Sequence, residues 1–475
     1  MIGMALRAAT TGRRRRLGGG RLGSGRLGSG RLGSGRLGSG RLGAGGGAGF
    51  ALAACAALVL AVPAGAAASA RPGGGSARVR AEPVLEVSRG CAGQNAEVEQ
   101  AVDYPYVYEA WIGCRGIGFA RSTNGGRSFG HPLLVPGSAV PGTLRVGNFF
   151  IPKKGWDPAV AVAPDGTLYV SYMVIRHHSE HPVVAASTDH GASFTRVAQV
   201  LPPTQPKVSF GDRDFIAVAP DGTIYLTWIY GHNVAKVLTG TGHAYVFLQK
   251  SADGGKTWSR MTPVSRGDLE AAAAPLLIEP GGRIDVLMWT VHHESFTSSA
   301  DGGRTWSTLV AVRPGAGRID FGALGIDAAL GIDTAGTLYA TWNTQRPGGD
   351  IGWLSYSTDH GRTWSAARRV TPGHNAGHIM AVAGGRPGIA YLGWLSLNTR
   401  HGFAQYLRPF SVHRGWLSAP VRVSRKFGNR HIWPGDTIGI SVLTRGHGGP
   451  RVMLSWASAI SQQTSQIWAA SVTGL

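Results

Sequence analysis

The chain has 475 residues, of which 43% are hydrophobic and only 15% charged, enough for one large domain. Its 47 Lys and Arg outnumber its 26 Asp and Glu, which gives a net charge of +21 at pH 7. The basic residues are scattered and do not gather in one stripe interleaved with aromatic residues, so the pattern argues against nucleic acid as a partner.

Residues 1–70 are basic and contain no acidic residue. They hold ten Arg, five of them in repeats of the type RLGSG, a low-complexity sequence that cannot build a core. An apolar run at residues 50–62 follows, and small residues then lead to Ala70. This order is typical of a secretory signal, so we expect cleavage near Ala70 and a secreted protein. Lipidation at Cys55 and a retained membrane anchor remain alternatives, although the run is shorter than the ~20 residues of a membrane span.

Removal of residues 1–70 leaves 37 Lys and Arg against 26 Asp and Glu, a net charge of +11. We expect residues 71–82 to be a linker and residues 83–475 to be one domain. Its basic charge favours an anionic wall, mucin or acidic-glycan surface as the partner. Two cysteines remain, Cys91 and Cys114. An even number in an exported chain predicts one disulfide, with two buried free thiols as the alternative.

A short pattern, Ser-x-Asp-x-Gly-x-(Thr/Ser)-(Trp/Phe), dominates this domain. It occurs at residues 122–129, 187–194, 251–258, 299–306 and 357–364, the first copy being the weakest. A segment that recurs every 48 to 65 residues marks a repeat architecture. In each copy the Asp accepts hydrogen bonds from turn amides and the Gly supplies a positive φ, which is a structural role. The Asp residues to which we assign it are Asp189, Asp253, Asp301 and Asp359.

A second repeat lies between these boxes. Turn sequences such as Pro-Asp-Gly at residues 164–166 and 220–222 each precede an apolar run that ends in a large aromatic residue. Alternating β-branched and aromatic residues between Gly and Pro turns predict strands. Four strands per unit predict an all-β chain folded as a β-propeller. Seven units carry the aromatic, which we assign to packing: Trp111, Tyr172, Trp228, Trp289, Trp342, Trp394 and Trp456.

The two ends of the domain predict how the ring closes. The last unit begins at Asp436 and has only three strands before the chain stops. Residues 83–90 match the outer strand of another unit at residues 261–267. Pairing of this N-terminal strand with the C-terminal blade removes the open edges. We therefore favour seven blades over six, although the sixth unit has only a degenerate box and the seventh has none.

The box motifs resemble those of the Asp-box, or BNR-repeat, β-propellers of the sialidase-like superfamily, over residues 83–475. The resemblance implies the fold, and it implies either a glycoside hydrolase or a propeller that only binds. In sialidases an Arg triad holds the substrate carboxylate, a Tyr paired with a Glu is the nucleophile and an Asp is the acid/base. The first Arg of that triad lies in a Phe-Arg-Ile-Pro motif, and in the closest string here, residues 149–152, Phe150 takes its place. Phe cannot form the bidentate guanidinium contact, so a standard exo-sialidase is not expected.

Acidic residues near the start of successive inner strands are the candidate catalytic groups. The propeller fold places these positions on the face opposite the box turns, around the mouth of the central channel. Two such carboxyl groups provide the acid and the base or nucleophile of glycosidic cleavage. The alternative is that each carboxylate caps a turn. The candidates are Asp157, Asp212, Asp214, Glu270 and Asp436, with Asp268 and Asp327 at related positions.

Arg213 and Arg430, with Trp156 and Trp433, are the candidate substrate-binding residues. A guanidinium binds carboxylates or hydroxyls, and an indole face packs on a pyranose. Packing between blades is the alternative for either Trp. No cofactor is expected, and a metal held by loop histidines is a weaker alternative. Those histidines are His177, His178, His181, His292, His293, His374 and His378.

Two hypotheses of function follow. In the first, the chain is a secreted glycan-active propeller, of hydrolytic type, that uses the acidic residues named above. In the second, it is a non-catalytic propeller that binds a cell-wall polymer or an exported protein through the same loops. A membrane partner is expected only if the signal segment stays uncleaved.

Overall fold

The computed structural model of the chain describes residues 79–475 with several short gaps, and every regular element in them is a β-strand. No helix in this part is long and apolar enough to cross a membrane. The predicted basic segment, the signal and most of the linker lie outside the described residues. Besides residues 1–78, the residues outside the description are 147–148, 177–178, 201–208, 232–242, 265–270, 273–274, 291–293, 313–327, 345–349, 373–375, 399, 444–448 and 461–462.

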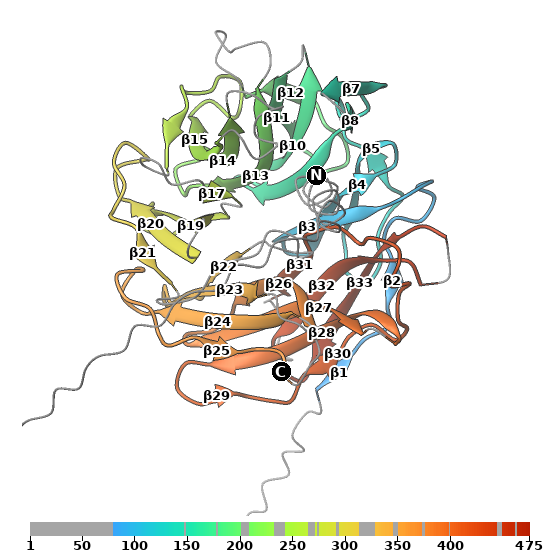
Figure 1. Cartoon of the computed structure of the whole chain (residues 1–475), viewed down its shortest axis with the longest axis vertical. Helices are drawn as coiled ribbons and strands as arrows, with labels where there is room; N and C mark the ends of the chain where they lie inside the picture. Colours follow the sequence, from blue (N-terminus) through green and yellow to red (C-terminus); the bar gives the residue numbers. More distant parts are fainter. Residues whose placement is uncertain are drawn as a thin grey trace, which may run out of the picture. The chain divides into compact units, whose positions relative to one another are not determined.

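The strands form seven antiparallel sheets arranged as the blades of a ring (Figure 1). Blade 1 contains β3 (Ala96–Asp103), β4 (Tyr106–Gly113), β5 (Gly116–Ser122) and β6 (Leu133–Leu134). Blade 2 contains β9 (Trp156–Val162), β10 (Leu168–Arg176), β11 (Ser179–Ser187) and β12 (Arg196–Gln199). Blade 3 contains β13 (Phe210–Val218), β14 (Ile224–Gly231), β15 (Tyr245–Ser251) and β16 (Thr262–Pro263). A separate hairpin between blades 1 and 2 is formed by β7 (Thr143–Val146) and β8 (Phe149–Pro152).

The remaining blades repeat this plan, with the inner strand of blade 4 and the outer strand of blade 6 each in two pieces. Blade 4 contains β17 (Ala271–Ala272), β18 (Leu276–Ile278), β19 (Ile284–Thr290), β20 (Glu294–Ser299) and β21 (Val310–Ala311). Blade 5 contains β22 (Ala329–Ile332), β23 (Leu338–Thr344), β24 (Ile351–Ser357) and β25 (Arg368–Arg369). Blade 6 contains β26 (Ala376–Gly384), β27 (Ile389–Asn398), β28 (Gly402–Ser411), β29 (Gly415–Trp416) and β30 (Val421–Arg422).

Blade 7 joins the two ends of the domain. It contains β31 (Gly439–Leu443), β32 (Arg451–Ser458) and β33 (Gln466–Thr473), and its outer edge is β1 (Arg80–Ala81) and β2 (Leu85–Glu86). β2 is antiparallel to β33, with Leu85 opposite Ala469. The predicted seven blades and the predicted closure are thus confirmed. The closing strand starts earlier than expected, since β1 lies in the region assigned to the linker and pairs with Thr473 and Val472.

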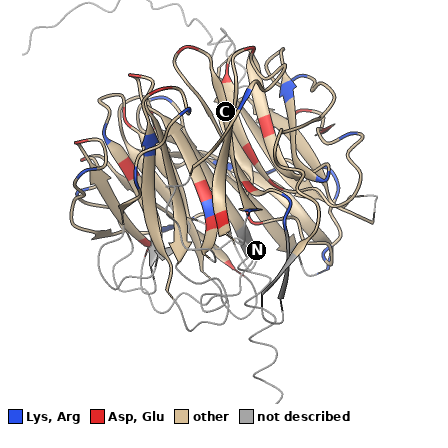
Figure 2. Cartoon of the chain, turned by 90° about the horizontal axis from the view of Figure 1, so that it is seen from above, with Lys and Arg blue, Asp and Glu red and all other residues tan. Residues whose placement is uncertain are grey.

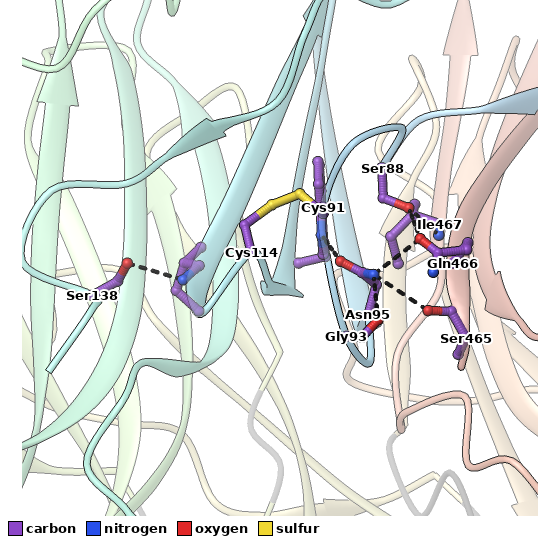
Figure 3. Close-up of a disulfide and its surroundings, with 11 residues drawn as sticks. Ser88, Cys91, Gly93, Asn95, Cys114, Ser138, Ser465, Gln466 and Ile467 are labelled. Carbon is purple, nitrogen blue, oxygen red and sulfur yellow. Dashed lines mark hydrogen bonds between the residues drawn. A yellow bond between two sulfur atoms is a disulfide. The ribbon is translucent and has the colours of Figure 1, made fainter. Parts of the chain in front are cut away.

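Polar contacts and a disulfide fix the closing strand (Figure 3). Ser88 Oγ donates a hydrogen bond of 2.8 Å to Gln466 Oε1, and Asn95 Nδ2 donates to the same oxygen at 3.0 Å. Cys91, just after β2, forms a disulfide with Cys114 in the β4–β5 turn. The start of the domain is therefore tied both to blade 7 and to blade 1.

The box turns carry out the role expected of them. In the turn of Asp359, Ser357 Oγ and the Thr363 backbone N–H donate to Oδ1 at 2.7 and 2.9 Å, while Thr363 Oγ1 donates to Oδ2 at 2.6 Å. Asp189, Asp253 and Asp301 make equivalent bonds.

The strand-end aromatic side chains form the core between blades. Trp111, Tyr172, Trp228, Trp342, Trp394 and Trp456 are each at most 1% exposed. The side chain of Trp289 lies outside the description. Because burial of large apolar side chains is the main favourable term in folding, this layer holds the ring together.

Candidate functional site

The candidate residues lie at the end of the central channel where the inner strands begin. Each blade is antiparallel, so the Pro-Asp-Gly turns and the box turns share the opposite end, as the sequence predicts. A channel cavity of about 260 Å³ is lined by inner strands from all seven blades, and Asp436 is part of its wall. Asp157 lies within β9 and Asp212 to Asp214 lie within β13, so these residues belong to the strands and not to the joining loops. Figure 2 shows acidic and basic positions side by side on strands near the middle of the molecule.

Three successive blades share an irregularity at this end. The registers of β3, β9 and β13 are each broken by a bulge next to the strand-end aromatic of the blade. Glu97, Asp157 and Arg213 occupy these bulges with φ values of 52°, 47° and 50°. A residue other than glycine in this left-handed region costs of order 1–3 kcal/mol, and such strain is concentrated at functional sites. The bulges turn one charged residue per blade toward a common point.

Arg213 connects these residues. Its guanidinium Nη2 lies 3.0 Å from Asp436 Oδ2, and both side chains are about nine-tenths buried. Its backbone N–H donates to Asp157 Oδ2 at 3.2 Å. Beside it, Trp156 Nε1 donates to Asp212 Oδ1 at 3.2 Å. The contacts join blades 2, 3 and 7 around one buried cation, and we call Glu97, Asp157, Asp212, Arg213, Asp214 and Asp436 the carboxyl cluster.

The carboxyl groups of the cluster differ in their ionisation. Burial, and then the negative charge of Asp157, raise the pKa of Glu97 well above its usual value. No N–H or hydroxyl donor reaches either Glu97 carboxyl oxygen within the described residues, and a hydrogen bond between the Glu97 and Asp157 carboxyl groups adds to the rise in the pKa of Glu97. Burial also acts to raise the pKa of Asp157, but the Arg213 cation and hydrogen bonds from Glu97 and Asp212 outweigh it and hold that pKa well below its usual range. Burial and the Asp157 charge raise the pKa of Asp212 to about 8.

Two further carboxyl groups lie in the same region. Burial raises the pKa of Asp214 well above its usual value, and the Ser171 hydroxyl lowers it only in part. Glu180 in β11 accepts a hydrogen bond of 2.9 Å from the Gly211 backbone N–H, and burial raises its pKa to about 8. At neutral pH the cluster therefore combines an ionised Asp157 with protonated neighbours.

Sequence reasoning missed Glu97 and Glu180. Glu97 is the second residue of the first inner strand just as Asp157 is the second residue of the next one, so its alignment with Asp157 is the signal that marks it. Glu180 lies within the His-rich sequence HHSEH, in which the histidines are the more prominent signal. Glu180 is only 3% exposed, and its carboxyl group contacts β13 through the hydrogen bond from Gly211.

The other candidates are distributed differently. Glu270, Asp268 and Asp327 lie outside the described residues. Trp156 is only 3% exposed and packs in the core of blades 2 and 3. Arg430 is exposed, with its Nε 3.1 Å from His431 Nε2, and Trp433 is half-buried in the same segment, which leads to Asp436.

The histidines form no metal centre in the part of the chain that the structure describes. His181 is buried, with its Nδ1 3.2 Å from the Ser179 carbonyl oxygen. His177, His178, His292, His293 and His374 lie outside the description, as does the side chain of His378.

Comparisons with known proteins agree with the repeats. Residues 150–316 match the family model of a BNR repeat-like domain, and residues 355–366 match that of the BNR/Asp-box repeat. No curated protein shows significant similarity to the chain.

Among solved structures, an ulvan lyase of polysaccharide lyase family PL25 is 13% identical, with a TM-score of 0.54, covering 82% of this chain and 95% of the lyase. The K499G mutant of the NanB sialidase from Streptococcus pneumoniae is 8% identical, with a TM-score of 0.48, over 78% of this chain and 83% of that one. A leech intramolecular trans-sialidase is 11% identical, with a TM-score of 0.45, over 81% and 92%. At these identities the likeness concerns the fold alone. The two repeat-model matches and the closed ring of seven blades show that the chain is a seven-bladed β-propeller that contains BNR/Asp-box repeats.

Proposed function

We propose that this protein is an exported glycan-active propeller that cleaves glycosidic bonds at the carboxyl cluster. The observation that carries the proposal is the convergence of Glu97, Asp157 and Arg213 from three strained bulges onto one point. Strain of this kind persists only where the surroundings enforce it, and it is concentrated at active sites. The names of the structural neighbours, which include sialidases and polysaccharide lyases, support a glycan as the substrate.

The roles in the proposal follow from the ionisation states. Asp212, with a pKa of about 8, keeps its proton at neutral pH and serves as the general acid toward the glycosidic oxygen. Asp157, held ionised by Arg213, serves as the base or nucleophile. Two carboxyl groups whose environments separate their pKa values are the arrangement that acid/base cleavage needs. Arg213 is bonded to Asp436 and acts in this proposal by positioning Asp157.

The test is turnover of Asp157→Asn and Asp212→Asn on a panel of polysaccharides, measured as new reducing ends or unsaturated ends. We expect each change to lower turnover by at least about 100-fold, in line with the size of general acid/base effects. Asp221→Asn is the matched control, since Asp221 lies in a turn at the other end and accepts a hydrogen bond from the Thr223 backbone N–H of its own turn. If both variants turn over the substrate at the wild-type rate, Asp157 and Asp212 are not the catalytic pair.

A second candidate, a non-catalytic binding propeller, is favoured by one observation. Every member of the cluster is at most 7% exposed, as expected of a group that fastens blades 1, 2, 3 and 7 together. In that function the protein binds a glycan or a wall polymer without releasing any ends. Asp157→Asn then leaves glycan binding intact, and the wild-type protein releases no ends, so turnover of the wild type separates the two candidates.

Export is part of the proposal as well. A basic region, an apolar run and small residues up to Ala70 support it, and the Cys91–Cys114 disulfide fits an oxidising compartment. Sequencing of the N-terminus of the protein recovered from culture medium tests this. A start near residue 71 supports cleavage, whereas an intact N-terminus on cell-bound protein rejects it.

A further inference from the structure

Two pockets are lined in part by residues 131–134 and by residues 137–141 respectively, at the end of the propeller that carries the carboxyl cluster. The first has a volume of about 380 Å³, and Arg89, Arg115 and His131 line it together with Leu133 and Leu134. The second has a volume of about 470 Å³ and is lined in part by Lys153 and Arg176. The residues between the pockets belong to the segment that leads from β6 toward the β7–β8 hairpin.

Hydrogen bonds place this segment at the mouth end of blades 1 and 2. Ser138 Oγ accepts a bond of 2.9 Å from the Ile117 backbone N–H at the start of β5, and its carbonyl accepts one of 2.7 Å from Gly155, just before β9. The hydroxyl of Tyr172 in β10 donates to the Pro136 carbonyl. Both pockets therefore adjoin the β4–β5 turn and the strand ends from which the cluster is built.

The charge of this surface has one sign. Arg89, Arg115 and His131 are exposed, and Lys153 and Arg176 are half-buried. No acidic residue lines either pocket, and none of these five side chains is paired with a carboxylate in the part of the chain that is described. The sequence shows the same bias, because no Asp or Glu occurs between Glu109 and Asp157 while six Lys or Arg do.

The disulfide in Figure 3 links the two segments that carry Arg89 and Arg115. It joins Cys91, two residues after Arg89, to Cys114, next to Arg115. Cys114 and Arg115 have φ values of 51° and 72°, so both central residues of this hairpin turn are left-handed. Such turns favour Asn and Gly, so the presence of Cys and Arg here is not explained by turn formation.

We propose that Arg89, Arg115, His131, Lys153 and Arg176 form a basic platform that binds an acidic polysaccharide, one that carries uronate or sulfate groups. The planar guanidinium groups match carboxylate and sulfate oxygens in bidentate geometry. Leu133 and Leu134, 38% and 43% exposed, offer an apolar contact to a sugar face between the charges. Lys153 lies four residues before Asp157, so a polymer on the platform extends toward the carboxyl cluster. The platform names the substrate class of the proposed function. That the bound polymer is also cleaved rests on the proposed function.

The experiment measures binding rather than turnover. The affinity of the full chain for polygalacturonate, dextran sulfate and neutral dextran is determined at about 0.15 M salt, where weak long-range attraction is screened. Arg115→Gln combined with Arg176→Gln should weaken binding of the favoured acidic polymer by about 100-fold, about tenfold for each lost charge-assisted contact. The matched control is Lys256→Gln combined with Arg304→Gln, which removes the same charge from exposed box turns at the other end of the propeller. The Arg-rich N-terminal segment is common to all variants, so only differences between them count.

Each result has one meaning. Loss with the platform pair and little change with the control pair supports the platform, and the polymer that binds better shows whether uronate or sulfate is recognised. Equal loss with both pairs, or no preference for the acidic polymers over neutral dextran, overturns it. If Arg176→Gln lowers the melting temperature, Arg89→Gln with Arg115→Gln replaces it, since both of these side chains are exposed. If the polymer binds to the platform but no ends are released, the proposed cleavage is rejected and the platform is supported. If a neutral glycan is cleaved, and equally well by the platform variants, the cleavage is supported and the platform is rejected.

Discussion

Both ends of this propeller carry aspartates, but Asp212 and Asp214 at the mouth end have properties opposite to those of the box aspartates. At the box end, each Asp accepts hydrogen bonds from its own turn, and those bonds hold the pKa of Asp189, Asp253 and Asp301 well below the usual value. At the mouth end, burial raises the pKa of Asp212 to about 8 and that of Asp214 well above its usual value. The difference teaches that the donors supplied by the local backbone, and not the residue type, decide whether an Asp caps a turn or stores a proton.

The largest test of this comparison is Arg213→Met. It removes the buried cation that contacts Asp157 and Asp436. A buried ion pair that loses one partner typically costs 3–5 kcal/mol of unfolding free energy. We expect a loss of about this size in urea unfolding, and a smaller loss for Arg213→Lys, which keeps the charge. A change below about 1 kcal/mol would show that the cluster does not depend on this cation.

The second test is the dependence of stability on pH. Asp212 and Glu180 have pKa values of about 8 in the folded protein, above those of the unfolded chain, so the folded state binds more protons from about pH 4 to about pH 8. The unfolding free energy should therefore fall as pH rises through this window, by at most about 1.4 kcal/mol per pH unit for each of the two groups. The box aspartates, whose pKa values are lowered, lose their contribution only below about pH 4 and leave this window unaffected.

Thermal unfolding at constant ionic strength measures this trend, and Asp212→Asn should make it shallower because one titrating group is gone. Turnover should fall with an apparent pKa near 8 if Asp212 is the acid. A melting temperature that rises steadily from about pH 5 to about pH 8 would contradict the assigned proton uptake of the mouth end.

The sequence predicts the box end far better than the mouth end. The box Asp, its Ser and its Thr lie within eight residues of one another, so their bonds follow from local spacing. The number of blades and the closure follow from repeats of the same local kind. The mouth end gathers Glu97, Asp157, Arg213 and Asp436 from positions up to 339 residues apart. No spacing rule reports that convergence, and the bulges that aim these side chains have no sequence signature beyond a charged residue near the start of an inner strand.

Asp359→Ala tests the box end and should have a smaller effect. The change removes three hydrogen bonds from the turn, but the carboxylate is half exposed, so water replaces part of what is lost. We expect a decrease of about 1 kcal/mol in unfolding free energy, and less for Asp359→Asn, which keeps one acceptor oxygen. Asp359→Ala should lower the unfolding free energy without lowering turnover, because the turn lies at the end away from the cluster. Loss of turnover in a folded Asp359→Ala protein would contradict the division of roles between the two ends.

The smallest effect, and the sharpest contrast, is expected for Glu97→Gln. If burial keeps Glu97 protonated at neutral pH, glutamine replaces a neutral carboxyl by a neutral amide of nearly the same shape, and its N–H still donates to Asp157. We expect a change below about 0.5 kcal/mol in unfolding free energy at about pH 7. Asp157→Asn at the neighbouring bulge should cost several times more, because it deprives Arg213 of a buried anion. Unfolding curves of the two variants measure both losses in unfolding free energy. Equal losses would mean that Glu97 and Asp157 carry the same charge, and Glu97 would then not hold the proton assigned to it.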